Sequence, residues 1–136
     1  MVLIKFEILG QPIAKQRPRV TRAGIAYTPS KTVNYEALVK YTYQSLYWNR
    51  DPILGHIEAN ITAVFPIPKS YSKKKTAELL AGHSNYDKKP DCDNLAKIVL
   101  DALNGIAYKD DSQVTVLHIR KEYGIQPKVI VELREI

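Results

Sequence analysis

The 136-residue sequence contains a single cysteine, only two phenylalanines and no long hydrophobic run. One cysteine excludes a disulfide within the chain and a zinc site built from several cysteines, and it fits a reducing compartment. No apolar stretch approaches the roughly 20 residues that a membrane-spanning helix needs. The N-terminus reads as a strand and lacks the basic start and apolar core of a signal peptide. These absences predict a cytoplasmic protein.

Several catalytic patterns are also missing. The three histidines, His56, His83 and His118, lie far apart and form no zinc-ligand motif. There is no Ser/His/Asp arrangement, no glycine-rich phosphate loop, no internal repeat and no low-complexity tract. The length fits one domain, residues 1–136.

Positive charge is in excess, with 20 Lys and Arg against 14 Asp and Glu and a net charge of +6. If the four clustered aspartates described below hold a metal, the remaining surface is more basic still. A basic surface favours a polyanionic partner, although charge alone does not identify one.

The segment 88–105 predicts a helix with one apolar and one polar face. The apolar residues recur at helical spacing: Leu95, Ile98, Val99, Ala102, Leu103 and Ile106. Four polar residues line the opposite side at intervals of four, four and three: Asp93, Lys97, Asp101 and Asn104. Pro90 predicts that the helix begins after it, with Asp91 or Asp93 as the cap. Gly105 suits the C-terminal end.

Four aspartates frame this helix. Asp91 and Asp93 flank one residue at its start, and Asp110 and Asp111 follow in a turn before the next strand. Four like charges brought to one point would repel each other, and a hard divalent cation would neutralise them. Mg²⁺ takes oxygen ligands and needs only one or two carboxylates besides water and substrate phosphate. Lys97 lies one turn beyond Asp93 and could reach a phosphate oxygen.

Three runs between Lys89 and Val114 carry a family resemblance: Lys-Pro-Asp-x-Asp-Asn-Leu-x-Lys, Asp-Ala-Leu-Asn-Gly and Asp-Asp-Ser-Gln-Val. They resemble the RusA-type Holliday junction resolvases, which are small, often phage-encoded endonucleases, and residues 15–19 and 27–29 extend the likeness more loosely. The resemblance implies a homodimer that binds four-way DNA junctions and cuts two strands symmetrically with Mg²⁺ or Mn²⁺. It also implies the functional residues: Asp91, Asp93, Asp111 and Lys97.

The resulting hypothesis is metal-assisted hydrolysis of a DNA phosphodiester. The residues expected to hold one or two Mg²⁺ are Asp91, Asp93 and Asp111, with Asp110 as a candidate fourth ligand. Lys97 would assist through the phosphate charge, and Asp101 is expected to pair with Lys97. Taken singly, each residue also has an ordinary structural explanation, as a helix cap, a turn former or one half of an ion pair.

Three basic stretches are candidates for contact with DNA. The connection from Gly10 to Ser30 is long for a segment without predicted structure, and it carries four cations and no acid: Lys15, Arg17, Arg19 and Arg22. A lysine run lies in the first turn of a predicted helix, where a bound phosphate would offset an unfavourable interaction with the helix dipole: Lys73, Lys74 and Lys75. Lys88 and Lys89 precede the acids, where some family members carry arginines. For each stretch the alternative is a solvated loop or face.

The remaining pattern predicts an α+β fold with a small mixed or antiparallel sheet and helices packed mainly on one face. Strands are expected at 2–9, at 57–65, after Asp111 and at 129–136, the last two paired antiparallel. Helices are expected from Pro29 to about Asn49, with Thr28 as N-cap, and at 73–81, with Ser72 as N-cap.

The first helix is expected to present one face to the core: Tyr35, Leu38, Val39, Thr42 and Leu46. A wetter stripe beside it includes Tyr43 and Tyr47, which could stack on bases or pack on a partner subunit, or simply cover apolar surface.

Two other functions fit part of this pattern. One is a DNA-binding accessory protein without catalytic activity, in which the acids only neutralise nearby lysines. The other is a nuclease that cuts branched DNA with less selectivity. A Mg²⁺-dependent nicking assay on a synthetic four-way junction separates the first from an enzyme, and comparison with linear duplex separates the second.

Overall fold

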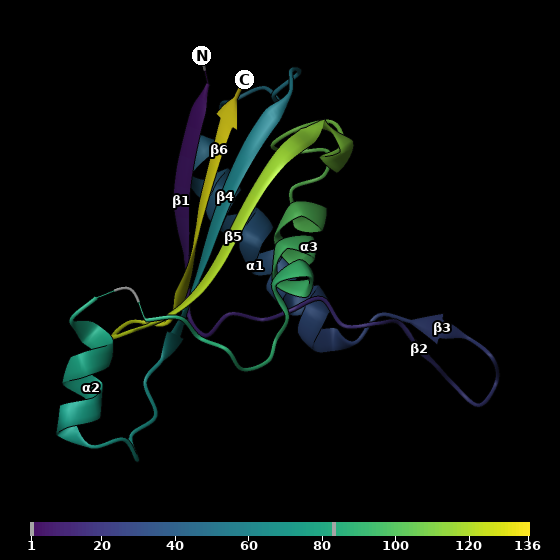
Figure 1. Cartoon of the computed structure of the whole chain (residues 1–136). Helices are drawn as coiled ribbons and strands as arrows, with labels where there is room; N and C mark the ends of the chain where they lie inside the picture. Colours follow the sequence, from purple (N-terminus) through teal and green to yellow (C-terminus); the bar gives the residue numbers. More distant parts are fainter. Residues whose placement is uncertain (1, 83) are drawn as a thin grey trace.

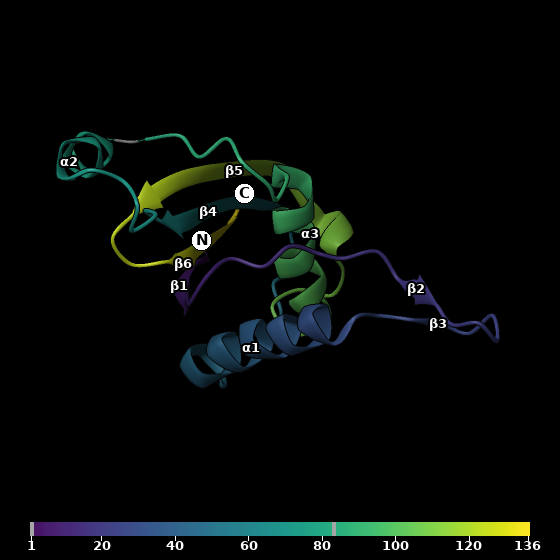
Figure 2. The same cartoon turned by 90° about the horizontal axis from the view of Figure 1, so that it is seen from below.

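A computed structural model describes residues 2–82 and 84–136 and has an α+β fold (Figure 1). The strands of its mixed sheet are β1 (Leu3–Leu9), β4 (Ile57–Pro66), β5 (Val114–Gly124) and β6 (Lys128–Glu135), in the order β1-β6-β4-β5. The helices are α1 (Ser30–Tyr47), α2 (Lys73–Leu80) and α3 (Cys92–Ala102). Seen from below, α1 and α3 cover one face of the sheet, while α2 stands away from it (Figure 2). The predicted fold class is confirmed.

The core lies between this sheet face and helices α1 and α3. Strand β1 alternates as predicted, with Ile4, Phe6 and Ile8 buried and their neighbours exposed. Strand β4 buries every second side chain from Ile57 to Phe65, and near its end Val64 of the other face is buried as well. The other sheet face carries polar residues, so the sheet is half-buried, as its alternation requires.

The predicted pairing of the last two strands is wrong. Strand β4 lies between them, pairing parallel with β5 and antiparallel with β6. Val129, Val131 and Leu133 of β6 are at most 2% exposed, so β6 needs a central position with helices over it. Strand β5 has no fully buried residue and fits an edge. The parallel β4–β5 pair uses a crossover through α2 and α3, as parallel strands require.

Helix α1 departs from its prediction in two ways. Its N-cap is Pro29 rather than Thr28, and no side chain caps it. Tyr43 is buried against Phe6, with ring centroids 5.7 Å apart, whereas Leu38 and Leu46 are exposed. The helix is therefore rotated relative to the predicted face, because its aromatic stripe fills the core better than its leucine stripe.

The long connection before α1 is not structureless. Its tip forms a two-stranded hairpin from β2 (Arg19–Val20) and β3 (Ala26–Tyr27). The hairpin projects to the opposite side from α2, and the start of α3 lies between these two projections (Figures 1 and 2). Helix α2 is confirmed, including its cap, because the Ser72 hydroxyl accepts a hydrogen bond from the Lys75 amide.

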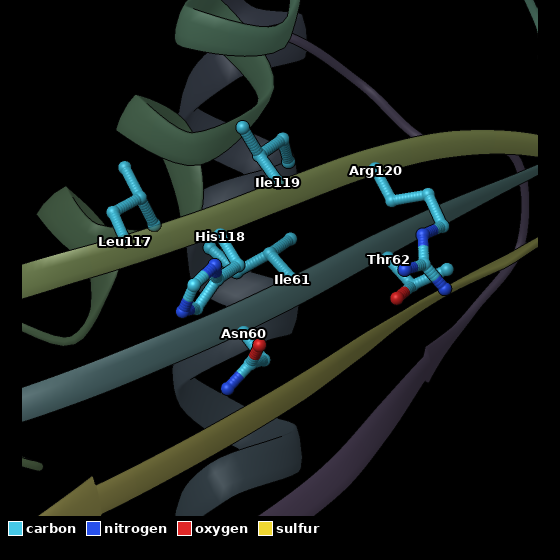
Figure 3. Close-up of a pocket in the computed structure, with 7 residues that line it drawn as sticks. All are labelled: Asn60, Ile61, Thr62, Leu117, His118, Ile119 and Arg120. Atoms are coloured by element: carbon cyan, nitrogen blue, oxygen red, sulfur yellow. The ribbon is translucent and has the colours of Figure 1, made fainter.

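The uncovered sheet face has a hollow along β4 and β5 (Figure 3). Asn60, Thr62, His118 and Arg120 lie on this side, and Ile119 points toward the helices. His118 pairs with Glu58 at 3.0 Å, and the hydrogen bonds from His118 and Arg134 hold the pKa of Glu58 below its usual range. The hollow contains none of the predicted site residues.

Two further observations bear on the exclusions made from sequence. Within 2–82 and 84–136, no helix is long and apolar enough to cross a membrane. His83, one of the three histidines, lies outside the described residues.

Candidate active site

Helix α3 forms as its periodicity predicts and presents a polar face. Five of the six predicted apolar residues are at most 2% exposed and the sixth, Ile106, is partly buried. Gly105 has a φ of +78°, which fits its predicted place just after the helix. The buried stripe fixes the rotation of α3, so Asp93 and Lys97 point away from the core and are exposed.

The carboxylate of Asp91 is not used to hold the helix together. Asp91 occupies the N-cap position with extended backbone angles, yet its side chain makes no capping hydrogen bond. Asp93 lies in the first helical turn, and both side chains are exposed. Two exposed oxygen donors at one helix start fit a hard cation such as Mg²⁺, which needs only one or two protein carboxylates.

Asp110 has a structural role. It is the N-cap of the 3₁₀ turn η1 (Asp111–Gln113), and its carboxylate accepts a hydrogen bond from the Ser112 amide at 3.1 Å. Hydrogen bonds from the Ser112 side chain and backbone hold the pKa of Asp110 below its ordinary value. The carboxylate is therefore engaged in the turn that places its neighbour Asp111.

Asp111 lies beside the C-terminal end of α3. Its amide donates to Asn104 Oδ1 at 2.8 Å, and Asn104 Nδ2 donates to its carboxylate at 3.4 Å. Burial raises the pKa of Asp111, and the neighbouring carboxylates of Asp101 and Asp110 raise it further. The hydrogen bond from Asn104 acts in the opposite direction, but the net effect penalises the charged carboxylate, and a bound cation would offset that penalty.

The two acidic groups are not brought together within one chain. Asp91 and Asp93 lie at the start of α3, whereas Asp111 lies past its far end, and an eleven-residue helix is about 16 Å long. The described residues contain no group of three or more His, Cys, Asp or Glu placed to hold a metal. The expected convergence of Asp91 and Asp93 with Asp111 is therefore not present in the single chain.

Lys15 is held in an ion-pair network rather than left free for DNA. Its ammonium lies 3.0 Å from Glu36 of α1 and 3.4 Å from Asp101 of α3, with all three side chains no more than 25% exposed. Partial burial alone would lower the pKa of Lys15, but the two carboxylates outweigh it and the pKa is raised. Asp101 thus pairs with Lys15, which corrects the expected Lys97 pair. The Lys15 amide also donates to the Asn94 carbonyl, which fixes the base of the connection from Gly10 to Ser30, called the arm below, to α3.

The other predicted cations fall into three groups. Those on the arm are exposed: Arg17, Arg19 and Arg22. On α2, Lys73, Lys74 and Lys75 are exposed, and the Lys75 ammonium lies 4.1 Å from the centre of the Tyr71 ring. Lys88 and Lys89 are exposed in the loop that leads into α3. Lys88 donates to the Tyr71 hydroxyl at 3.2 Å, and this hydrogen bond lowers the pKa of Tyr71. The arginines and the α2 lysines therefore leave positive charge on the two projections that flank the start of α3, and Lys88 and Lys89 add charge directly before it.

Gln113 is a site residue that the sequence reasoning missed. Its side-chain amide donates to the carbonyls of Ile53 and Gly55 at 2.7 and 3.0 Å. Its oxygen accepts from the amides of Lys109 and Asp110 at 2.8 and 3.1 Å. One side chain therefore ties the Asp110–Asp111 turn to the segment before β4. The family-like run Asp-Asp-Ser-Gln-Val contained this residue, and a capping-box pattern was the signal that could have found it.

Comparison with known proteins gives two findings. The family model described as "Endodeoxyribonuclease RusA" matches residues 10–134. The chain is 38% identical to "Uncharacterized protein YqaN" of Bacillus subtilis (strain 168), over all of this chain and 99% of that relative. The matched segment includes the arm, α3, η1 and the four aspartates Asp91, Asp93, Asp110 and Asp111.

Proposed function

The chain belongs to the RusA endodeoxyribonuclease family, and from this premise we propose that it resolves four-way DNA junctions by Mg²⁺-dependent, symmetric strand cleavage. The observation that carries the proposal is the pair of exposed carboxylates at the start of α3, neither needed for capping, between two basic projections. Because its substrate is cellular DNA, we place the protein in the cytoplasm.

Asp91 and Asp93 are proposed to hold the cation, Mg²⁺ or Mn²⁺, together with a DNA phosphate. When bound, the cation would supply charge stabilisation at the phosphate and an activated water. Lys97, one turn along the same face, would bind a phosphate oxygen and stabilise the charge that grows as the bond breaks. The Lys15–Glu36–Asp101 network would hold the base of the arm beside α3.

Asp111 is proposed to act in the same reaction, although it lies at the far end of α3. Two arrangements would bring it in: a DNA strand that follows the polar face of α3, or a homodimer with antiparallel α3 helices. A two-fold dimer would also match the approximate two-fold symmetry of a junction and its paired cuts. In such a dimer, Asp91 and Asp93 of one protomer lie beside Asp111 of its partner.

A subunit-mixing experiment separates these arrangements. Asp91→Asn and Asp111→Asn proteins, each inactive alone, are mixed and allowed to exchange subunits. If each site combines residues from two protomers, the mixed dimer keeps one intact site and nicks the junction. If each site is built within one protomer, both sites of the mixed dimer are defective and no cleavage returns.

The basic projections are proposed to bind the DNA backbone around the cut. Arg17, Arg19 and Arg22 lie on one projection and the lysines of α2 on the other, while Lys88 and Lys89 lie in the loop that leads into α3. These contacts would recognise shape and charge rather than base sequence, as phosphate contacts do. Separate projections suit a branched substrate, whose arms leave the branch point in different directions.

The proposal is tested by cleavage of a labelled four-way junction and of a linear duplex, each with and without Mg²⁺. We expect paired nicks in opposing strands of the junction, only with the metal, and little cutting of the duplex. Binding without cleavage would instead support a non-catalytic DNA-binding protein. Equal cleavage of both substrates would support a less selective nuclease.

A further inference from the structure

The loop that leads into Asp91 is fastened to strand β5 near both of its ends. The Tyr86 amide donates to the Lys121 carbonyl at 3.1 Å, and the Tyr123 amide donates to the Ser84 carbonyl at 3.0 Å. Asn85 forms an antiparallel bridge with Glu122. Residues 84–86 thus behave as a short additional strand on the outer edge of β5.

The last part of the loop is held by side chains instead. The Lys121 ammonium donates to the carbonyls of Lys88 at 2.7 Å and Pro90 at 2.9 Å. The Tyr86 hydroxyl donates to the carbonyl between them, that of Lys89, at 3.1 Å. Three consecutive carbonyls, the last directly before Asp91, therefore each accept a hydrogen bond from a side chain.

The two anchoring side chains also support each other. The Tyr86 ring stacks on Phe65 of β4, with centroids 3.9 Å apart and planes 7° apart. The Lys121 ammonium lies 5.6 Å from the centre of the Tyr86 ring, within the range of a cation–π interaction. Lys121 belongs to strand β5, and its contact with Tyr86 links it to the buried Phe65 of β4. Both anchors of the loop are therefore held by the sheet.

We propose that Lys121 is a positioning residue for the nuclease site: it fixes the backbone ahead of Asp91 so that this carboxylate is held where it can bind the metal. Lys121 acts through the loop carbonyls and touches neither DNA nor metal. The inference rests on the proposed function for its consequence on cleavage, but its structural part concerns the loop alone. Groups that orient ligands in this way typically change metal affinity or activity by about 10–100-fold when they are removed.

The test compares Lys121→Met, which keeps most of the side-chain length but loses the donors, with Arg120→Met. Arg120 precedes Lys121 on β5, is exposed and lies on the opposite sheet face (Figure 3), so its substitution removes the same charge without touching the loop. Tyr86→Phe removes the third carbonyl bond and keeps the stacked ring. Three quantities are measured: the Mg²⁺ dependence of junction cleavage, Mn²⁺ affinity by electron paramagnetic resonance, and junction affinity in EDTA.

A fourth measurement does not depend on activity. The Leu95 amide donates to the Asp91 carbonyl at 3.2 Å, so its hydrogen exchange reports whether the start of α3 is held. We expect Lys121→Met to raise the Mg²⁺ requirement and lower Mn²⁺ affinity about 10–100-fold, and to speed Leu95 exchange. Tyr86→Phe should change the Mg²⁺ requirement, the Mn²⁺ affinity and the Leu95 exchange rate in the same direction, but by less. Arg120→Met should match the wild type in metal dependence, Mn²⁺ affinity and Leu95 exchange, and any change in junction affinity should be the same in the Lys121 and Arg120 variants.

Several outcomes would overturn the proposal. Equal Mg²⁺ dependence and equal Leu95 exchange in Lys121→Met and Arg120→Met would show that the loop does not need Lys121. A selective loss of junction affinity in Lys121→Met would assign Lys121 to DNA contact instead. If Lys121→Met does not fold, Tyr86→Phe decides, and unchanged metal dependence there refutes the idea. Wild-type protein that fails to cleave would refute the proposed function, while the exchange comparison would still decide the role of Lys121.

Discussion

Replacement of Gln113 by alanine should destabilise the protein by about 2–4 kcal/mol. The side chain makes four hydrogen bonds between 2.7 and 3.1 Å, two donated and two accepted. A hydrogen bond contributes about 0.5–1.5 kcal/mol net. The two bonds to the Ile53 and Gly55 carbonyls are partly buried. The two bonds accepted from the Lys109 and Asp110 amides are exposed, so each of these contributes near the lower end of that range.

Urea unfolding followed by circular dichroism measures this change as a shift in midpoint at constant slope. The control is Gln126→Ala, because Gln126 is exposed in the β5–β6 connection and its loss should change stability by less than about 0.5 kcal/mol. Gln113→Glu adds a finer test, since it keeps an acceptor for the turn but sets a carboxylate against two carbonyls. It should be at least as destabilising as alanine. A change below about 0.5 kcal/mol for Gln113→Ala would refute the reasoning.

Three further predictions follow from the fold and the charges. Burial and the Asp101 carboxylate raise the pKa of Asp111, so the metal-free protein should become more stable as the pH falls through that raised pKa. In thermal melts, Asp111→Asn should be more stable than the wild type at neutral pH and should lack this contribution to the pH dependence of stability. Arg19→Ala and Arg22→Ala should each weaken junction binding at all sequences and reduce the slope of log affinity against log salt by about 1, measured by fluorescence anisotropy. Ile61→Ala should cost about 2–5 kcal/mol in urea unfolding, because Ile61 is 1% exposed at the centre of the sheet.

The parts of the fold that could be predicted from the sequence are mostly those with a local pattern of buried and exposed residues. The alternation in β1 and β4 and the periodicity of α3 each reflect one buried face, so a single stretch of sequence was enough to recognise them. The place of β5 in the sheet was not local: whether it pairs with β4 or β6 depends on the crossover through α3 and on which strand needs two neighbours. The rotation of α1 was missed for a similar reason, since Tyr43 competes with Leu38 and Leu46 for the same core and only the shape of that core decides.

The candidate site divides in the same way. Asp91, Asp93 and Lys97 follow from their spacing on one helix, because helix geometry fixes which side chains share a face. The partners of Lys15 do not follow from spacing, since Glu36 and Asp101 come from two other elements. Lys121 was also beyond reach, as its contacts depend on the path of a loop more than thirty residues earlier in the chain. Charged residues read as solvated or DNA-binding can thus be held by contacts that only the tertiary structure creates.

The most direct test of the central claim is the single-turnover rate of junction cleavage in Mg²⁺ for wild type, Asp91→Asn and Asp51→Asn. Asp51 is an exposed acid in the connection before β4, so its variant removes the same charge away from α3. We expect Asp91→Asn to lower the rate by more than about 100-fold, because several kcal/mol of charge stabilisation are lost, while junction binding stays equal or tighter. Asp51→Asn should cleave like the wild type. Normal cleavage by Asp91→Asn, or loss of binding together with cleavage, would contradict a catalytic role for the acids at the start of α3.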